Sequence, residues 1–220
     1  IFHVIKIKII KSNLKKKNFL ISISSNKKNN SKNDLYRERL KFINWAEKNN
    51  KVKFDFYGYG WNNYDNSNTF FRKFVKKFKA QNFVTKKKFK NYKGEYVGLK
   101  KELMKKYKFA ICFENAKNFE GWVTEKIFHC FFSGCIPIYY GAKNISNIIP
   151  SNCYIDYKSF KNNKELINFL ENMDQKNLDK YIKNISLYLS SKQFKNNFTL
   201  DAFSKKIFQQ IKNDLNSINV

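Results

Sequence analysis

The sequence of 220 residues has little acidic charge, with 17 aspartates and glutamates against 44 lysines and arginines and a formal net charge of +27. A field of one sign attracts polyanions without a specific site. A nucleic-acid-binding module is therefore one hypothesis, and association with a membrane surface is left open. The lysines are, however, spread along the whole chain rather than gathered in one stretch. We interpret the charge as compositional drift with a solvated surface, and do not expect nucleic acid as a partner.

The sequence also lacks the patterns that hold metals and dinucleotides. Its four cysteines include no CxxC pair and only two histidines could join them, so we expect no zinc site and mostly buried, reduced thiols. No DxD pair is present to hold a divalent ion, and the GYG at residues 58–60 lacks the third glycine of a dinucleotide fingerprint. The sequence therefore predicts a site that needs no metal and no other cofactor.

Long apolar runs are missing too. The first ten residues, IFHVIKIKII, alternate lysine with apolar residues, which is typical of a strand rather than of a membrane span or signal peptide. The chain begins with Ile1 rather than Met, so we expect a processed, trimmed or partial sequence.

Hydrophobic periodicity predicts alternating strands and helices. Strands are expected at residues 1–10, 19–24, 52–56, 109–113 and from 136 onward. Helices are expected from a cap at Asp34 to about residue 49, at 70–78, from Thr124, and in three stretches after residue 164. Asp55 and Gly58 are expected in a turn. The alternation predicts an α/β fold, with a Rossmann-like domain over residues 1–160 and a helical C-terminal extension over residues 161–220 that packs on it.

Polar residues that could bind a ligand follow the buried run FAICF at residues 109–113. Glu114 and Asn115 come directly after it and would lie at the carboxyl edge of a parallel sheet, where α/β folds bind ligands. The next helix begins near Thr124, which can cap it, and the unpaired N–H groups of a helix start favour phosphate.

The two charged residues that follow Thr124 suit different parts of a nucleotide. Lys126 would dominate the affinity for a diphosphate, since a charge-assisted hydrogen bond contributes ~1.5–3 kcal/mol against ~0.3–1 kcal/mol for the helix dipole. Glu125 would repel phosphate and suits neutral hydroxyls, such as those of a ribose. Taken alone, the tripeptide also fits an ordinary capped and solvated first helical turn.

A longer sequence pattern favours the ligand-binding interpretation over the ordinary helical turn. The blocks YKFAICFEN, WVTEKIF, GCIPIYYGA and SNCYID occur in this order over residues 107–156. This pattern resembles glycosyltransferase family 10, the α-1,3/4-fucosyltransferases. The resemblance implies the C-terminal, donor-binding domain of a two-domain (GT-B type) enzyme whose donor is GDP-fucose.

The resemblance also implies roles for single residues. Asn115 falls on a donor-binding asparagine, Glu125 on the ribose-binding glutamate and Lys126 on the diphosphate-binding lysine, while Glu114 matches a donor-side position. Trp122 stands where the family usually has tyrosine, so a stacking surface is kept and the hydroxyl is lost. ERLKFI at residues 38–43 resembles the element that carries a diphosphate-neutralising arginine. Arg39 is our choice for it, and Arg37 is the alternative under a two-residue alignment slip.

The implied activity is inverting transfer of fucose from GDP-fucose to a hydroxyl of a glycan acceptor, such as an N-acetyllactosamine-type oligosaccharide. The general base of the family lies in the N-terminal domain, which we expect this sequence to lack, so no catalytic base is assigned. A donor-binding remnant without catalysis is a further alternative. Location stays open, because family members are cytoplasmic in bacteria and anchored in the Golgi membrane in eukaryotes.

Overall fold

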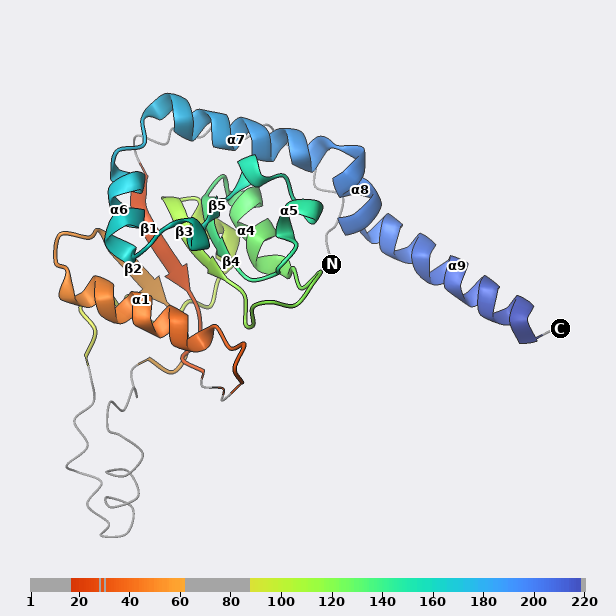
Figure 1. Ribbon diagram of the computed structural model, residues 1–220, viewed down its shortest axis with the longest axis horizontal. Coiled ribbons are helices and arrows are strands. Elements are labelled where there is room, and N and C mark those ends of the chain that lie inside the picture. The colour runs from red at the N-terminus through yellow and green to blue at the C-terminus, as the bar shows by residue number, and fades with distance from the viewer. Residues whose placement is uncertain (1–16, 28, 30, 62–87, 219–220) are drawn as a thin grey trace, which may run out of the picture.

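The computed structural model describes residues 17–27, 29, 31–61 and 88–218. Within them, the strands form one parallel sheet in the order β2-β1-β3-β4-β5 (Figure 1). The strands are β1 (Asn18–Ile23), β2 (Phe54–Tyr57), β3 (Tyr107–Phe113), β4 (Ile136–Tyr140) and β5 (Ile155–Asp156).

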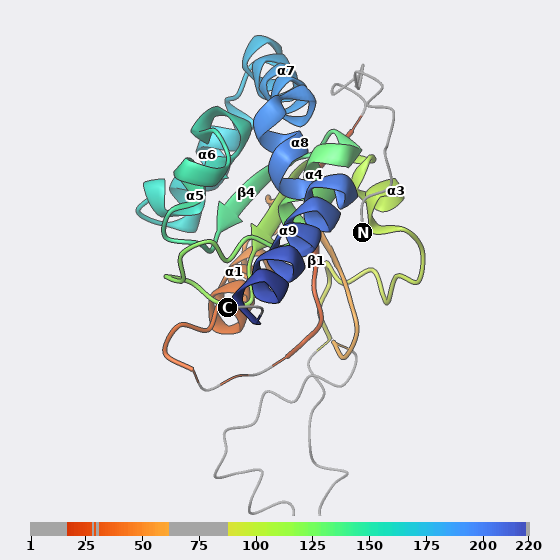
Figure 2. The same ribbon diagram turned by 90° about the vertical axis from the view of Figure 1, so that its right-hand side faces the viewer.

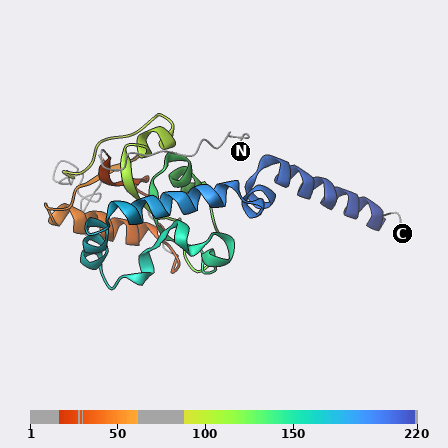
Figure 3. The same ribbon diagram turned by 90° about the horizontal axis from the view of Figure 1, so that it is seen from above.

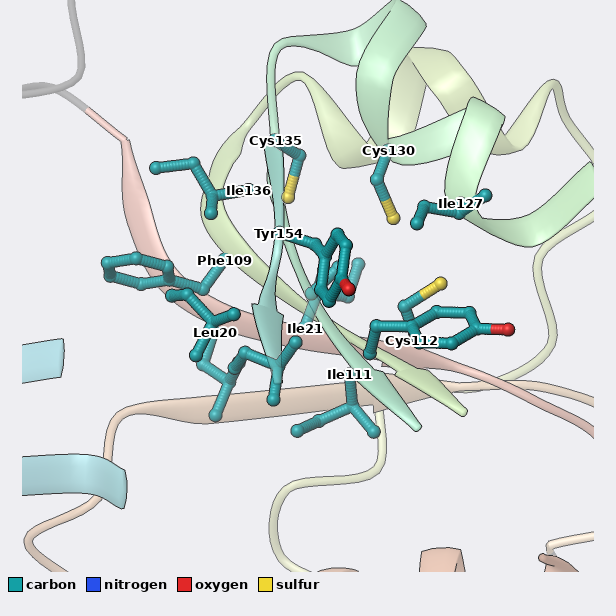
Figure 4. Packing of buried hydrophobic residues seen from close by; sticks show 14 of the residues in the cluster. Leu20, Ile21, Phe109, Ile111, Cys112, Ile127, Cys130, Cys135, Ile136 and Tyr154 are labelled. Atoms are coloured by element: carbon teal, nitrogen blue, oxygen red, sulfur yellow. The ribbon is translucent and has the colours of Figure 1, made fainter. Parts of the chain in front are cut away.

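β3 is the central strand, and its sequence explains why. Every residue of YKFAICF is buried except the half-buried Lys108, which suits a parallel strand covered on both faces. Phe109 pairs with Leu20 of β1 on one side and with Ile136 of β4 on the other. Figure 4 shows the side chains of this core, with Ile127 and Cys130 packing onto the sheet from a neighbouring helix.

Helices cover both faces of the sheet. In Figure 2 the sheet runs between α1 (Tyr36–Lys48) and α6 (Asn163–Glu171) on one side, and α3 (Lys100–Met104) and α4 (Glu125–Ser133) on the other. α1 buries Phe42 against Phe54 of β2, with the two ring centroids 5.4 Å apart. Gly134 is the C-cap of α4, and its left-handed φ of 62° favours glycine.

The C-terminal part contains more helices than the sequence predicts. After α5 (Ile145–Ile148) and the short turns at Ser151–Cys153 and Tyr157–Ser159 come α6, α7 (Gln175–Ser190), α8 (Lys192–Phe198) and α9 (Leu200–Ile218). The sequence predicts three helical stretches here, whereas the structure has four, α6 to α9. The hydroxyl of Ser191 accepts the N–H of Phe194 and that of Thr199 accepts the N–H of Ala202, so each starts a new helix. α9 runs away from the sheet (Figures 1 and 3).

Most of the predicted elements are confirmed, with shifted ends. The predicted strand at 1–10 and helix at 70–78 lie outside the described residues, and the boundary at residue 160 stays a prediction. The prediction of a turn at Asp55 is wrong, since Asp55 lies inside β2 and accepts a hydrogen bond of 2.8 Å from the Tyr107 hydroxyl. All four cysteines are buried and free, as expected. None of the helices among the described residues is both long and apolar enough to cross a membrane.

The strand order creates a crevice between β1 and β3. The connection from β1 runs through α1 to β2, while that from β3 runs through α4 to β4 on the opposite side. The two loops therefore separate at the carboxyl ends of these strands, where open parallel sheets bind ligands.

Candidate functional site

An open pocket of about 240 Å³ occupies this crevice. Such a volume is close to the range of about 300–1000 Å³ for small-molecule sites. The pocket is lined by the ends of β1 and β3 and by helices α1, α3 and α4. Its polar lining residues are Ser24, Ser25, Lys27, Tyr36, Arg39, Lys100, Asn115, Glu125, Lys126 and His129. Four of the residues predicted from the sequence, Arg39, Asn115, Glu125 and Lys126, thus share one cavity.

Glu114 organises the start of α4 from behind the pocket. Its side chain is closed to solvent, and Oε1 accepts the backbone N–H of Thr124 at 2.9 Å. Oε2 accepts the Thr124 hydroxyl at 2.7 Å and the Lys126 ammonium at 3.0 Å. Gly141 leaves room for this carboxylate, because a Cβ there would collide with the Glu114 side chain.

This arrangement corrects the prediction that the Thr124 side chain caps α4, and it places Glu114 outside the pocket lining. Thr124 stands at the N-cap position of α4, but its hydroxyl makes no capping bond, because it donates to Glu114 instead. Glu114 is not among the pocket's lining residues, although Asn115 beside it is. The reason is strand geometry, since successive side chains at the end of β3 point to opposite sides.

The Lys126 side chain is oriented but not fully engaged. Its ammonium donates to Glu114 and, at 2.9 Å, to the Thr124 hydroxyl. An ammonium has three N–H donors, so a third remains for a ligand. The side chain is 27% exposed and lines the pocket, so this donor can reach an anion there.

Arg39 is held against the carboxyl end of β3. Its Nη2 atom donates to the carbonyl oxygens of Phe113 at 2.9 Å and Glu114 at 3.1 Å. The guanidinium carbon lies 5.2 Å from the ring centroid of Tyr36, and Arg39 as a whole residue is 5% exposed. Burial lowers the pKa of Arg39, but an arginine so far above neutrality stays charged.

The two arginines of α1 lie in different surroundings. Arg37 is exposed, forms a 3.8 Å ion pair with Asp34, and does not line the pocket, whereas Arg39 does. Asp34 itself lies one residue before the cap position of α1, which Leu35 occupies, and its carboxylate accepts the N–H of Tyr36.

Glu125 and His129 stand one helical turn apart on the pocket face of α4. Burial alone would raise the pKa of Glu125, but its own backbone N–H and the charges of Lys126 and Lys100 lower it overall, so the carboxylate is ionised. Burial and then Lys100 lower the pKa of His129, which leaves its imidazole neutral near pH 7. Both can exchange hydrogen bonds with uncharged groups of a ligand.

Trp122 lies outside the pocket. Its side chain is 48% exposed and pairs with Phe119, with ring centroids 6.1 Å apart. The structure therefore does not bring Trp122 together with Lys126 in the cavity, although both were predicted for one donor site.

Several lining residues were missed from the sequence. Ser24 and Ser25 follow β1 at the same sheet edge as Asn115, and that shared edge was the available signal. His129 could have been found from its four-residue spacing to Glu125. Tyr36 carries no such signal, because its place in the pocket wall is known only from the structure, where the Arg39 guanidinium lies over its ring.

The fold is that of a Rossmann-like, GT-B type glycosyltransferase domain. A crystal structure of an α1,3-fucosyltransferase with GDP-fucose superposes with a TM-score of 0.53 and 22% identity, over 78% of this chain and 40% of that one. An α1,3-fucosyltransferase with GDP gives a TM-score of 0.51 and 21% identity, over 86% of this chain and 50% of that one.

Sequence comparison identifies the family. Residues 13–211 match the model of glycosyltransferase family 10 (fucosyltransferase), C-terminal part, and the chain belongs to this family. It is 37% identical over 82 residues to the α-(1,3)-fucosyltransferase FucT of Helicobacter pylori, and 37% identical over 70 residues to an α-(1,4)-fucosyltransferase of Arabidopsis thaliana. It is also 34% identical over 94 residues to GDP-fucose protein O-fucosyltransferase 3 of Xenopus tropicalis.

These matches cover only part of each protein. They span 37%, 32% and 42% of this chain, but 17%, 17% and 18% of the three relatives.

Proposed function

We propose that this chain binds GDP-fucose and supplies the donor-binding half of an inverting fucosyltransferase that acts on a glycan hydroxyl. One observation carries the proposal. Arg39 and Lys126, from helices on opposite faces of the sheet, meet Asn115 and Glu125 in the pocket between β1 and β3.

Two cationic groups would hold the diphosphate. The third N–H of Lys126 is available to it, and Arg39 stands beside the end of β3 with its charge buried. Ser24 also lines the pocket, but its hydroxyl is buried and has no hydrogen-bond partner among the described residues, so it would have to turn toward the cavity to donate to a ligand oxygen.

The opposite charge of Glu125 would bind the ribose. Its ionised carboxylate can accept hydrogen bonds from two neighbouring hydroxyls, and phosphate would be repelled from it. Asn115 can donate and accept, which suits the junction between the sugar and the diphosphate.

The reaction would proceed by direct displacement. The acceptor oxygen attacks the anomeric carbon of fucose from the face opposite GDP, and the bond from that carbon to the β-phosphate oxygen breaks. The electron pair leaves with GDP, whose growing negative charge Lys126 and Arg39 stabilise. The hydroxyl proton passes to a carboxylate base, which we assign to no residue of this chain. The proposed scheme uses no metal and no other cofactor.

Calorimetry with GDP tests the proposal. Lys126→Ala should weaken GDP binding roughly 10- to 100-fold, the equivalent of one charge-assisted hydrogen bond. Glu125→Ala should weaken the binding of both GDP and guanosine. Lys105→Ala is the matched control, because it removes the same charge from an exposed lysine that pairs with Glu102 outside the pocket.

The two alternatives give different results. A chain that did not bind GDP, but lost oligonucleotide affinity steeply with added salt, would be a polyanion binder. A donor-binding remnant would bind GDP as predicted and yet transfer no fucose when it is supplied with every other part of a family enzyme. Equal GDP affinity in the Lys126→Ala, Glu125→Ala and Lys105→Ala variants would refute the site.

A further inference from the structure

Two large aromatic side chains stand exposed on the loop between β3 and α4. Phe119 is 47% exposed and Trp122 is 48% exposed, and their rings, 6.1 Å apart, contact each other at a tilt of 46°. We call them the aromatic pair. The chain's other tryptophan side chains, Trp45 and Trp61, pack in or against the hydrophobic core. Trp122 is therefore the tryptophan that offers a ring face to a ligand.

The loop that carries the aromatic pair is firmly anchored. The carbonyl oxygen of Phe119 accepts the N–H of Lys143 at 3.2 Å, and the N–H of Gly121 donates to Oδ1 of Asn144 at 2.8 Å. Asn118 holds a left-handed φ of 66°, a conformation that a non-glycine residue keeps only when its surroundings impose it. The two rings are thus exposed in a loop whose backbone conformation is fixed by hydrogen bonds.

The position of the aromatic pair points to the transferred sugar. Trp122 lies two residues before Thr124, which contacts both Glu114 and the ammonium of Lys126. In a nucleotide sugar the sugar lies beyond the diphosphate, away from the nucleoside. If Lys126 binds the diphosphate and the nucleoside lies within the pocket, the sugar lies toward the surface outside the pocket, next to the start of α4.

We propose that the aromatic pair is a stacking surface for a pyranose ring of the acceptor glycan. A pyranose presents one face of C–H groups, and the negative face of an aromatic ring attracts such partly positive hydrogens. A tryptophan has the largest such face, and ordering its side chain costs little conformational entropy because it has few rotatable bonds. The exposed Lys143, bonded through its backbone to Phe119, adds donors for sugar hydroxyls. This inference rests on the proposed function.

Saturation-transfer NMR on the whole chain, with N-acetyllactosamine as the probe, tests the inference. We expect transfer from aromatic protons to the C–H protons on one face of a pyranose ring. Trp122→Ala should abolish this transfer, Phe119→Ala should reduce it, and Trp122→Tyr should retain it. Phe208→Ala is the control, because it removes an aromatic ring that is 74% exposed and belongs to α9 rather than to the loop.

Calorimetry with GDP on the same variants separates this inference from the donor site. Neither Trp122→Ala nor Phe119→Ala should change the GDP affinity. A loss of GDP affinity in Trp122→Ala as large as that in Lys126→Ala would overturn the inference, because it would make Trp122 a donor contact. An absent signal in the unaltered chain, or one unchanged by Trp122→Ala, would overturn it too. A chain that bound the saccharide through Trp122 but not GDP would retain the aromatic surface and refute the donor site.

Discussion

The ammonium of Lys126 lies 3.0 Å from a carboxylate oxygen of Glu114, whose side chain is closed to solvent. The pair joins the end of β3 to the first turn of α4. Its desolvation offsets much of its attraction, so it need not stabilise the fold strongly. What it does is fix where the lysine points, with one N–H donor left toward the pocket.

Removing the Glu114 carboxylate should destabilise the domain. Glu114→Ala leaves the N–H of Thr124 and the ammonium of Lys126 without their partner, and an unsatisfied buried group costs about 1–3 kcal/mol in the free energy of unfolding. Urea unfolding followed by circular dichroism measures this change. Glu120→Ala is the control, since it deletes an exposed carboxylate of the same loop and should change stability by about 0.5 kcal/mol at most.

Glu114→Gln separates shape from charge, because its amide oxygen can still accept from Thr124. It should recover most of the stability that Glu114→Ala loses. A Glu114→Ala variant as stable as Glu120→Ala would show that the network does not hold α4 in place.

The two arginines of α1 should respond differently to substitution. Arg39→Ala removes the donor to two main-chain carbonyl groups and a buried positive charge, so both the free energy of unfolding and the affinity for GDP should fall. Arg37→Ala removes only an exposed side chain with a 3.8 Å ion pair and should alter neither by a measurable amount. Thermal unfolding and calorimetry on the two variants provide the comparison. The reverse order of effects would mean that Arg37 is the residue that faces the donor.

His129 should make the fold sensitive to mild acid. Burial and the charge of Lys100 lower its pKa in the folded chain, while Glu125 opposes them and Lys101 and Lys126 act with Lys100. As the pH falls below the unfolded value of about 6.5, the unfolded chain takes up the proton first, so the free energy of unfolding decreases. Above that pH the imidazole is neutral in both states and contributes nothing.

Urea unfolding between pH 7.5 and pH 5.5 measures this slope. His129→Gln should flatten it. A slope that His129→Gln does not alter would contradict the prediction.

The sequence predicts the pocket residues that are close together along the chain. Asn115, Glu125 and Lys126 follow one buried strand and begin the next helix, so strand and helix periodicity place them at the same edge. Strand and helix periodicity alone did not show that Asn115 lines the pocket while Glu114 does not. That depends on how β3 pairs with β1 and β4, and pairing is decided by residues far outside the motif.

Trp122 shows a second limit of the sequence. A tyrosine-like position next to Thr124 suggested a donor contact, yet the ring points outward to Phe119. The loop that carries Trp122 is anchored by hydrogen bonds of Phe119 and Gly121 to Lys143 and Asn144, which lie beyond β4 and have no local signature near the motif. Long-range backbone contacts of this kind leave no periodic pattern to read.

The pairing of β1 with β3 has a kinetic consequence. Asn18 lies opposite Tyr107, so forming the crevice brings together residues 107 − 18 = 89 positions apart. Closing so long a segment costs chain entropy before any contact between the strands repays it, and contacts at such separation slow folding. Nucleotide affinity should therefore emerge late as the chain refolds. During synthesis, the edge of β1 that pairs with β3 stays uncovered until the ribosome has made residues 107–113.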